Sequence, residues 1–249
     1  MSERLVELLD PRPGETVLEL AAGIGETGFL AAARLGPTGR LLSTDVAPEM
    51  VDAARRRAGE LGLRNVEHCV ADMTELALEA ASVDGVLCRF GVMLVPDVDA
   101  AAMEFARVLR PRGRAAFAVW ASADENPWIS TTGRVAIELG LADPPAPDAP
   151  GPFRFADPRR LPRLLDEVGL EVEGSEDVPI RWRAPSLDEW WETTRDTSRM
   201  LALLLGRLDR ADTERLRRAA AERLAQFVLP DGSLEAPGLA RVVRARRPG

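Results

Sequence analysis

Short apolar runs and amphipathic stretches alternate along the first half of the chain. Apolar runs of strand length occur five times, at Thr16–Ala21, Leu41–Val46, Val66–Ala71, Val83–Phe90 and Arg114–Trp120. Helical spacing of apolar residues occurs between them, over Glu26–Leu35, from Pro48 to Leu61 and over Asp97–Leu109. Glycine or proline follows each helical stretch, as is typical of helix ends. This alternation predicts a mostly parallel sheet covered by helices on both faces.

The second half of the chain has a different pattern. Asp143–Pro152 contains five prolines, so it is predicted to be a loop. Asp157–Val168 has helical spacing, and Leu170–Val172 and Val178–Trp182 are typical of short strands. A long helical pattern, Ser186–Phe227, and a strand-like tail, Ala240–Ala245, complete the chain.

These patterns predict one domain over residues 1–249, with a doubly wound, mostly parallel α/β sheet. Its predicted segments are a core at 1–121, a Pro-rich loop region at 122–156, a helix and strand at 157–185, a helical insert at 186–230 and a closing strand at 231–249. In open sheets of this kind, ligands bind beyond the carboxyl ends of the strands.

Composition excludes several kinds of chemistry. All 32 basic residues are arginine, there is no tyrosine, and His68 is the one histidine. Walker P-loops, pyridoxal Schiff bases and Ser–Lys dyads each need a lysine. A Ser–His–Asp hydrolase would need His68, and the chain has no G-x-S-x-G motif. The net charge of −8 argues against general binding to nucleic acid or to anionic membranes.

The cysteines and the termini give further expectations. Two cysteines and one histidine are too few for a closed zinc site, so no metal is expected. Cys69 and Cys88 lie in apolar runs and are expected to be buried, reduced thiols. The chain opens without a signal peptide and contains no apolar run of the ~20 residues that cross a bilayer. We therefore expect a cytoplasmic protein without a membrane span.

A glycine-rich turn, Gly23-Ile-Gly25-Glu-Thr-Gly28, follows the first predicted strand and opens the first predicted helix. Glycines let backbone N–H groups approach a ligand closely, and a helix N-terminus favours an anion. Asp45 ends the second strand, twenty residues beyond Gly25, where it could accept hydrogen bonds from ribose hydroxyls. The combination predicts a nucleoside-bearing cofactor; the alternative is a structural glycine turn with a helix-capping aspartate.

Two carboxylates help to separate the possible cofactors. Glu19 lies four residues before Gly23, where it suits a cationic amino group and would repel a pyrophosphate. Asp72 follows the third strand and could accept from an adenine amino group, with Met73 packed against the ring. A dinucleotide reductase of the short-chain type would also need tyrosine and lysine, which this chain lacks.

The sequence resembles the class I S-adenosylmethionine-dependent methyltransferases, in the broad small-molecule group that includes the quinone-biosynthesis methyltransferases. The motifs are Val17–Gly25, Asp45 with Met50, Ala71-Asp72-Met73 and Arg107–Arg114. They cover residues 14–121 closely and the rest of the chain more loosely. The resemblance implies a Rossmann-like methyltransferase fold, with a seven-stranded sheet and a helical insert before the last strand. It also implies S-adenosyl-L-methionine as cofactor and methyl transfer to a small molecule.

The resemblance also implies roles for particular residues. The acid at Glu19 meets the methionine amino group directly or through water, Asp45 holds the ribose hydroxyls, and Asp72 lies by the adenine. The expected cofactor-binding residues are Glu19, Ala21, Gly23, Gly25, Asp45, Val46, Met50, Asp72, Met73 and Arg89. The chain departs from the family at Ala21 and Arg112, where glycine is usual.

The acceptor is expected to be hydrophobic or aromatic, because tryptophans cluster after the predicted strands and in the insert. The expected acceptor-binding residues are Phe90, Met93, Trp120, Trp128, Trp190 and Trp191. The sulfonium is already activated, so in-line displacement gains mainly from proximity and orientation. His68, Asp124 and Glu125 are weak candidates for a base, with a structural role favoured for His68 and simple solvation for the other two.

Three other functions stay open at this point. An NAD(P)-dependent oxidoreductase fits the glycines and Asp45 but not Glu19 or Asp72. A non-catalytic S-adenosylmethionine-binding module would keep the same residues. A nucleic-acid methyltransferase is disfavoured because Arg89-Phe90-Gly91 stands where an N/D-P-P-Y tetrapeptide would follow the fourth strand. The expected partner is a small-molecule acceptor, not nucleic acid; the chain could be a monomer or a homodimer.

Overall fold

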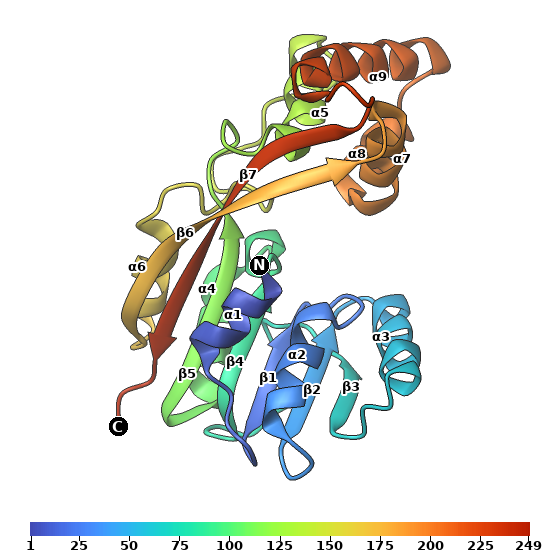
Figure 1. Ribbon diagram of the computed structural model, residues 1–249. Helices are drawn as coiled ribbons and strands as arrows, with labels where there is room; N and C mark the ends of the chain where they lie inside the picture. Colours follow the sequence, from blue (N-terminus) through green and yellow to red (C-terminus); the bar gives the residue numbers. More distant parts are fainter. The chain divides into compact units, whose positions relative to one another are not determined.

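Seven strands form one sheet in the computed structural model, which describes residues 1–249 (Figure 1). The strands are β1 (Thr16–Leu20), β2 (Arg40–Asp45), β3 (Val66–Val70), β4 (Val83–Arg89), β5 (Leu109–Trp120), β6 (Glu171–Ala184) and β7 (Leu234–Arg246). The helices are α1 (Ser2–Leu9), α2 (Glu26–Leu35), α3 (Pro48–Glu60), α4 (Val98–Val108), α5 (Pro127–Glu138), α6 (Arg160–Glu167), α7 (Leu187–Thr197), α8 (Arg199–Leu205) and α9 (Arg210–Leu224), with short 3₁₀ turns η1 (Val92–Leu94) and η2 (Ala225–Phe227).

The strand order is β3-β2-β1-β4-β5-β7-β6. Strands β1 to β5 pair in parallel, whereas β7 runs antiparallel to β5, with Trp120 opposite Ala240 and Arg114 opposite Arg246. The order reverses between β1 and β4, which is the point where open α/β sheets bind their ligands. The predicted doubly wound, mostly parallel, seven-stranded sheet is confirmed.

The alternation of side chains in β5 explains how helices cover both faces of the sheet. Ala116 and Ala118 belong to the core cluster that also contains apolar residues of α1, α2 and α3. Phe117 points to the opposite face, where its ring lies 5.3 Å from that of Phe105 in α4. Helix α6 contacts α4 on this second face.

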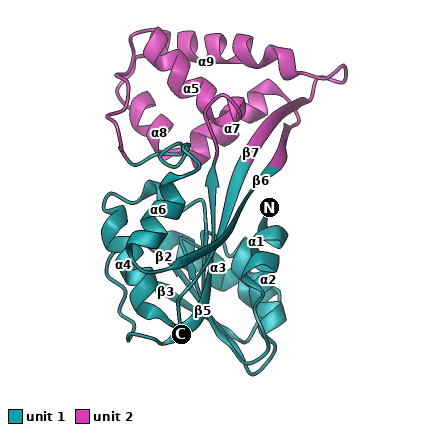
Figure 2. Ribbon diagram, turned by 90° about the vertical axis from the view of Figure 1, so that its left-hand side faces the viewer, with its two compact units in different colours: residues 1–120, 150–178, 240–249 teal, residues 121–149, 179–239 magenta.

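The chain divides into two compact units (Figure 2). Unit 1 comprises residues 1–120, 150–178 and 240–249, and unit 2 comprises residues 121–149 and 179–239. Unit 2 has its own apolar core, built from α5, α7, α8, α9 and the start of β7. The two units share the strands β6 and β7, because a boundary falls inside each of them.

Three elements differ from the sequence-based expectation. The region 122–156 was expected to be a loop but contains α5, which begins at Pro127, a residue suited to the first helical turn. The two short strands expected around Gly174 form the single strand β6, since Pro179 is tolerated on an edge strand. Helix α1 was not predicted; it buries Leu5, Val6 and Leu9.

The cysteine expectation was half correct. Cys88 is buried in β4, and burial raises the pKa of its thiol to about 12. Cys69 is exposed, so the expectation of a buried thiol there was wrong. The physical reason is that β3 is the edge strand of the sheet and only partly covered. None of the helices combines the length and apolarity needed to span a membrane.

Candidate cofactor site

Four strands of unit 1 end at the same edge of the sheet, and each brings a predicted site residue there. Asp72 follows β3, Asp45 ends β2, the glycine turn follows β1, and Arg89 ends β4. In sheet order the strands are β3, β2, β1 and β4, so these groups form a row. Neighbouring strands lie about 4.8 Å apart, which gives the row a length of roughly 14 Å.

The turn after β1 adopts a backbone that favours glycine. Gly23 and Gly25 have φ values of 56° and 83°, and a Cβ on Gly25 would lie 2.3 Å from the Phe29 ring. Ala21 also lies in the left-handed region, with φ of 49°, which accounts for the family's preference for glycine there. The turn is held to β2 by the Ala22 N–H, which donates to Thr44 O at 2.9 Å.

Asp45 links this turn to the end of β2. Its Oδ2 accepts from the Gly23 N–H at 2.8 Å, and its Oδ1 accepts from the Ala47 N–H at 3.0 Å. Each carboxylate oxygen has a second lone pair, so both can accept another donor. The half-buried Asp45 therefore combines a fixed orientation with free acceptor capacity, as ribose hydroxyls require.

Apolar side chains are exposed beside Asp45. Val46 is 66% exposed, and Ile24 and Met50 are each 43% exposed. A group of exposed apolar side chains next to polar groups is typical of a ligand-binding surface. The residues present therefore fit the apolar base and the polar ribose of S-adenosylmethionine.

Asp72 and Met73 lie beyond β3. Asp72 is exposed, and its Oδ1 accepts from the backbone N–H and the hydroxyl of Thr74, at 2.9 and 2.8 Å. Only Oδ1 of Asp72 accepts hydrogen bonds within the protein, so Oδ2 has room for the adenine amino group; that contact stays a prediction. Met73 is half-buried. Its Cε lies 3.5 Å from the position that a Cβ on Gly91 would take, so Met73 lies close to the turn after β4.

Glu19 has a different environment from the one expected. The residue is only 3% exposed, its Oε1 accepts from the Gly28 N–H at 2.6 Å, and its Oε2 lies 3.4 Å from Ser43 Oγ. Burial is the main cause that raises the pKa of Glu19 to about 7, against the lowering effect of the Gly28 N–H. A direct contact with a ligand amino group would require this carboxylate to leave its buried position. The geometry supports an indirect role, in which Glu19 fixes the first turn of α2.

Arg89 forms an ion pair that the sequence did not reveal. Its Nη2 donates to Oε2 of Glu26 at 2.9 Å, and the side chains are 30% and 48% exposed. Glu26 is the first residue of α2, directly after Gly25, so it stands on the glycine turn. The only sequence signal for Glu26 was its place in the first turn of a helix, where acidic residues are common for electrostatic reasons alone.

Phe90 and Trp120 form an aromatic stack at the ends of β4 and β5. Their ring centroids are 3.9 Å apart and the planes differ by 7°. Phe90 has a φ of 60°, and its N–H donates to Ala118 O at 2.8 Å, which holds this unusual backbone in place. Trp120 is 7% exposed and Met93 is 3% exposed, so the half-buried Phe90 offers the more accessible surface.

The other three predicted acceptor residues belong to unit 2. The Trp128 ring stacks on Trp182 at 5.2 Å, and the indole N–H of Trp190 donates to Trp128 O at 3.0 Å. Trp190 and Trp191 are 0% and 4% exposed within the core of that unit. The structure thus gives Trp190 and Trp191 a packing role, and acceptor contact by these tryptophans stays a prediction.

The candidate bases have other partners. His68 lies edge-on to the Phe29 ring at 6.2 Å, and its pKa is lowered by burial and by the charge of Arg55. Asp124 pairs with Arg134 at 2.5 Å, and Glu125 accepts from the Ser122 hydroxyl at 2.8 Å. No catalytic role follows from these contacts, and all three stay candidates.

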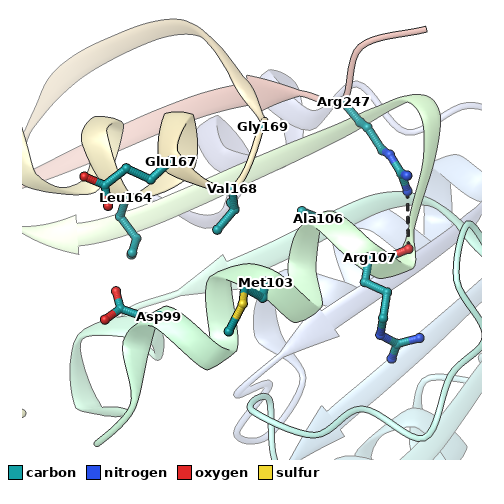
Figure 3. Close-up of a pocket in the computed structure, with 9 residues that line it drawn as sticks. All are labelled: Asp99, Met103, Ala106, Arg107, Leu164, Glu167, Val168, Gly169 and Arg247. Carbon is teal, nitrogen blue, oxygen red and sulfur yellow. Dashed lines mark hydrogen bonds between the residues drawn. The ribbon is translucent and has the colours of Figure 1, made fainter.

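A separate cavity of about 450 Å³ lies between α4 and α6 in unit 1. Figure 3 shows Met103 on α4 facing Leu164 and Val168 at α6. The guanidinium of Arg107 is engaged by Glu104 and by two carbonyls, and that of Arg247 by the carbonyls of residues 107 and 109. No predicted site residue lines this cavity.

The sheet order, the glycine turn and the carboxylates Asp45 and Asp72 agree with the expected class I methyltransferase fold. A family profile described as a methyltransferase domain matches residues 17–113. The aklanonic acid methyltransferase of a Streptomyces species is 38% identical over 205 residues, which cover 81% of this chain and 79% of that protein. The chain belongs to the S-adenosylmethionine-dependent methyltransferases, and S-adenosylmethionine is its cofactor.

Two further comparisons agree with this assignment. The nocamycin O-methyltransferase of Saccharothrix syringae is 40% identical over 114 residues, which span 46% of this chain and 41% of that protein. The crystal structure of an S-adenosylmethionine-dependent methyltransferase from Aquifex aeolicus has a TM-score of 0.56 at 21% identity, over 71% of this chain and 83% of that one. At this low identity the structural likeness shows the fold alone.

Proposed function

We propose that this chain transfers the methyl group of S-adenosylmethionine to a small hydrophobic or aromatic molecule. The observation that supports the proposal is the row of ligand groups at the carboxyl edge of β3, β2, β1 and β4, in a chain 38% identical to a methyltransferase over most of its length. The bound cofactor supplies an activated methyl group on a sulfonium. The chain's own contribution is to hold the two reactants in line and at close distance, which accounts for most of the rate gain in such reactions.

Distinct residues bind distinct parts of the cofactor in this proposal. Asp45 accepts from the ribose hydroxyls, Asp72 from the adenine amino group, and Val46 and Met50 cover the base. The Gly23–Gly25 turn brings the backbone close to the part of the cofactor that carries the methyl group. Glu19 fixes the start of α2 below that turn.

The acceptor class rests on two observations. The half-buried Phe90, stacked on Trp120, offers an aromatic group at the end of β4, next to the proposed methyl position, and flat rings gain from packing against such a group. The two relatives named above carry the small molecules aklanonic acid and nocamycin in their names. A flat apolar part of the acceptor fits the first observation, and a small-molecule acceptor agrees with the second. We assign no general base, because holding the two reactants close and in line supplies most of the rate enhancement.

Calorimetric titration with S-adenosylhomocysteine, with NADH and NADPH in parallel, tests the cofactor. We expect micromolar binding of S-adenosylhomocysteine and no binding of the nicotinamides; the reverse would overturn the proposal.

A turnover assay tests the acceptor class. It measures the release of S-adenosylhomocysteine from S-adenosylmethionine in the presence of flat aromatic phenols and acids, with aliphatic amines as the comparison set. Cofactor binding without turnover on the complete set would favour a non-catalytic binding module.

A further inference from the structure

The methionine end of the cofactor is a zwitterion, so its binding site must complement two opposite charges. Asp45 and Asp72 are proposed to bind the adenosine part. Glu19 is only 3% exposed, and its partners are the Gly28 N–H and Ser43 Oγ. The predicted amino-group contact by Glu19 therefore lacks an open carboxylate. Among the predicted cofactor-binding residues, Arg89 alone carries a positive charge.

The Glu26–Arg89 pair stands at the matching place in the row. Arg89 is the last residue of β4, the strand next to β1, and Glu26 directly follows Gly25 of the turn after β1. In the proposed site, the adenine lies at the end of β3, the ribose at the end of β2, and the glycine turn follows β1. The amino-acid end of the cofactor then lies at the end of β4, the next strand in the sheet. The order of the strands thus places the zwitterion beside these two side chains.

Both side chains have capacity left for a ligand. One hydrogen bond, 2.9 Å from Arg89 Nη2 to Glu26 Oε2, joins them, and both are partly exposed. A guanidinium has five N–H donors in a planar fork that matches a carboxylate, and a carboxylate accepts about four hydrogen bonds. Because exposed ion pairs add little to stability, the two side chains can turn toward a ligand at low cost.

We propose that the Glu26–Arg89 pair binds the amino-acid end of the cofactor. Arg89 binds the carboxylate of the cofactor, and Glu26 binds the ammonium group of the cofactor. This inference rests on the proposed function and specifies the binding of its cofactor. Each ion of the pair then faces an opposite charge of the ligand, and the pair also keeps Arg89 at the turn in the free protein. The Arg89 guanidinium is further located by the neighbouring Phe90 ring, 5.7 Å from its centroid.

Three ligands separate the contributions in calorimetric titrations. S-adenosylhomocysteine has both charged groups, S-adenosyl-3-thiopropylamine lacks the carboxylate, and 5′-methylthioadenosine lacks both. Arg89→Met should weaken S-adenosylhomocysteine at least tenfold and leave the other two within about twofold, since a charge-assisted hydrogen bond is lost only with the first ligand. Glu26→Gln should weaken S-adenosylhomocysteine and the amine but not 5′-methylthioadenosine.

Two control variants complete the test. Arg110→Met removes an arginine that pairs with Asp84 at the opposite end of β4 and should change none of the affinities. Arg57→Met removes the arginine whose Nη1 lies 3.4 Å from Ile24 O on the other side of the turn. Selective loss of S-adenosylhomocysteine affinity in Arg57→Met instead of Arg89→Met would overturn the inference.

Other outcomes also decide the question. Equal loss for all three ligands in Arg89→Met would mean a general distortion of the site, and no loss would mean no contact; either result contradicts the inference. If the unaltered protein bound 5′-methylthioadenosine as tightly as S-adenosylhomocysteine, the cofactor site would stand and the zwitterion contact would fail. If the unaltered protein bound none of the three, the proposed function itself would fail.

Discussion

In the proposed cofactor site, the contact with the ribose depends on Asp45. Asp45→Ala should weaken S-adenosylhomocysteine binding at least tenfold, because it removes two acceptor oxygens and frees the Gly23 N–H that Oδ2 holds. Isothermal titration measures the change. Asp52→Ala is the control, since Asp52 makes an exposed ion pair with Arg55 on α3. Unchanged affinity in Asp45→Ala, at intact folding, would remove the ribose assignment.

Glu19 gives a pH dependence whose sign follows from burial. Its pKa is about 7 in the folded chain against 4.5 for the ordinary side chain, so the folded state holds a proton that the unfolded state releases between these values. The free energy of unfolding should therefore fall as pH rises from about 4.5 to 7, by about 3 kcal/mol from this group.

Glu19→Gln isolates that contribution. Gln cannot titrate, and its amide oxygen can still accept from the Gly28 N–H. Urea unfolding at pH 4.5, 6 and 8 should show wild-type stability declining relative to the variant across this range. A constant difference between the two proteins would mean that the Glu19 carboxylate is not held at a raised pKa.

At the scale of elements, α2 is packed so closely on β1 that Gly28 admits no side chain. A Cβ on Gly28 would lie 2.0 Å from Oε2 of Glu19 and 2.9 Å from a methyl carbon of Leu41. Gly28→Ala should therefore destabilise the chain, by about 1–3 kcal/mol as for other overpacked sites. The matched control is Gly133→Ala in α5, where a Cβ meets nothing within 4 Å.

Gly133→Ala should raise stability by about 0.5–1 kcal/mol, because alanine is the better residue inside a helix. Chemical denaturation of both variants gives the comparison. Equal effects at the two sites would show that the helix propensity of alanine outweighs the contact with Glu19, and would contradict the tight packing of α2 on β1.

The elements also show where sequence patterns succeed. The five strands of residues 16–120 and the helices between them were predictable, because each strand contains a distinct apolar run and each helix has apolar residues at helical spacing. The end of α4 was not, since Pro111 and Gly113 lie inside β5 and the helix ends at Val108. Helix α1 and strand β6 were not: α1 has only eight residues, and the charged residues of β6 lie on a sheet edge that water reaches. Similarly, the exposure of Cys69 depends on β3 being an edge strand, which no local pattern states.

At the scale of the whole molecule, cofactor binding should raise the free energy of unfolding. A ligand that binds only the folded chain, at one hundred times its Kd, adds about 2.7 kcal/mol to the free energy of unfolding. S-adenosylhomocysteine at that excess should raise the unfolding temperature in calorimetry, whereas NADH at the same concentration should not. A rise with NADH alone would contradict the cofactor assignment.

The sequence by itself determined the alternation of strands and helices from β1 to β5, the glycine turn and the positions of Asp45 and Asp72 after strands, because periodicity, backbone freedom and charge are local properties of the chain. Only the tertiary structure decided which side chains are buried and which partners they contact. It enclosed Glu19 against Gly28, joined Arg89 of β4 to Glu26 of α2, 63 positions apart, and buried Trp190 within unit 2. Such partners are set by strand order and packing across the sheet, and residues distant in sequence meet only when the sheet has formed.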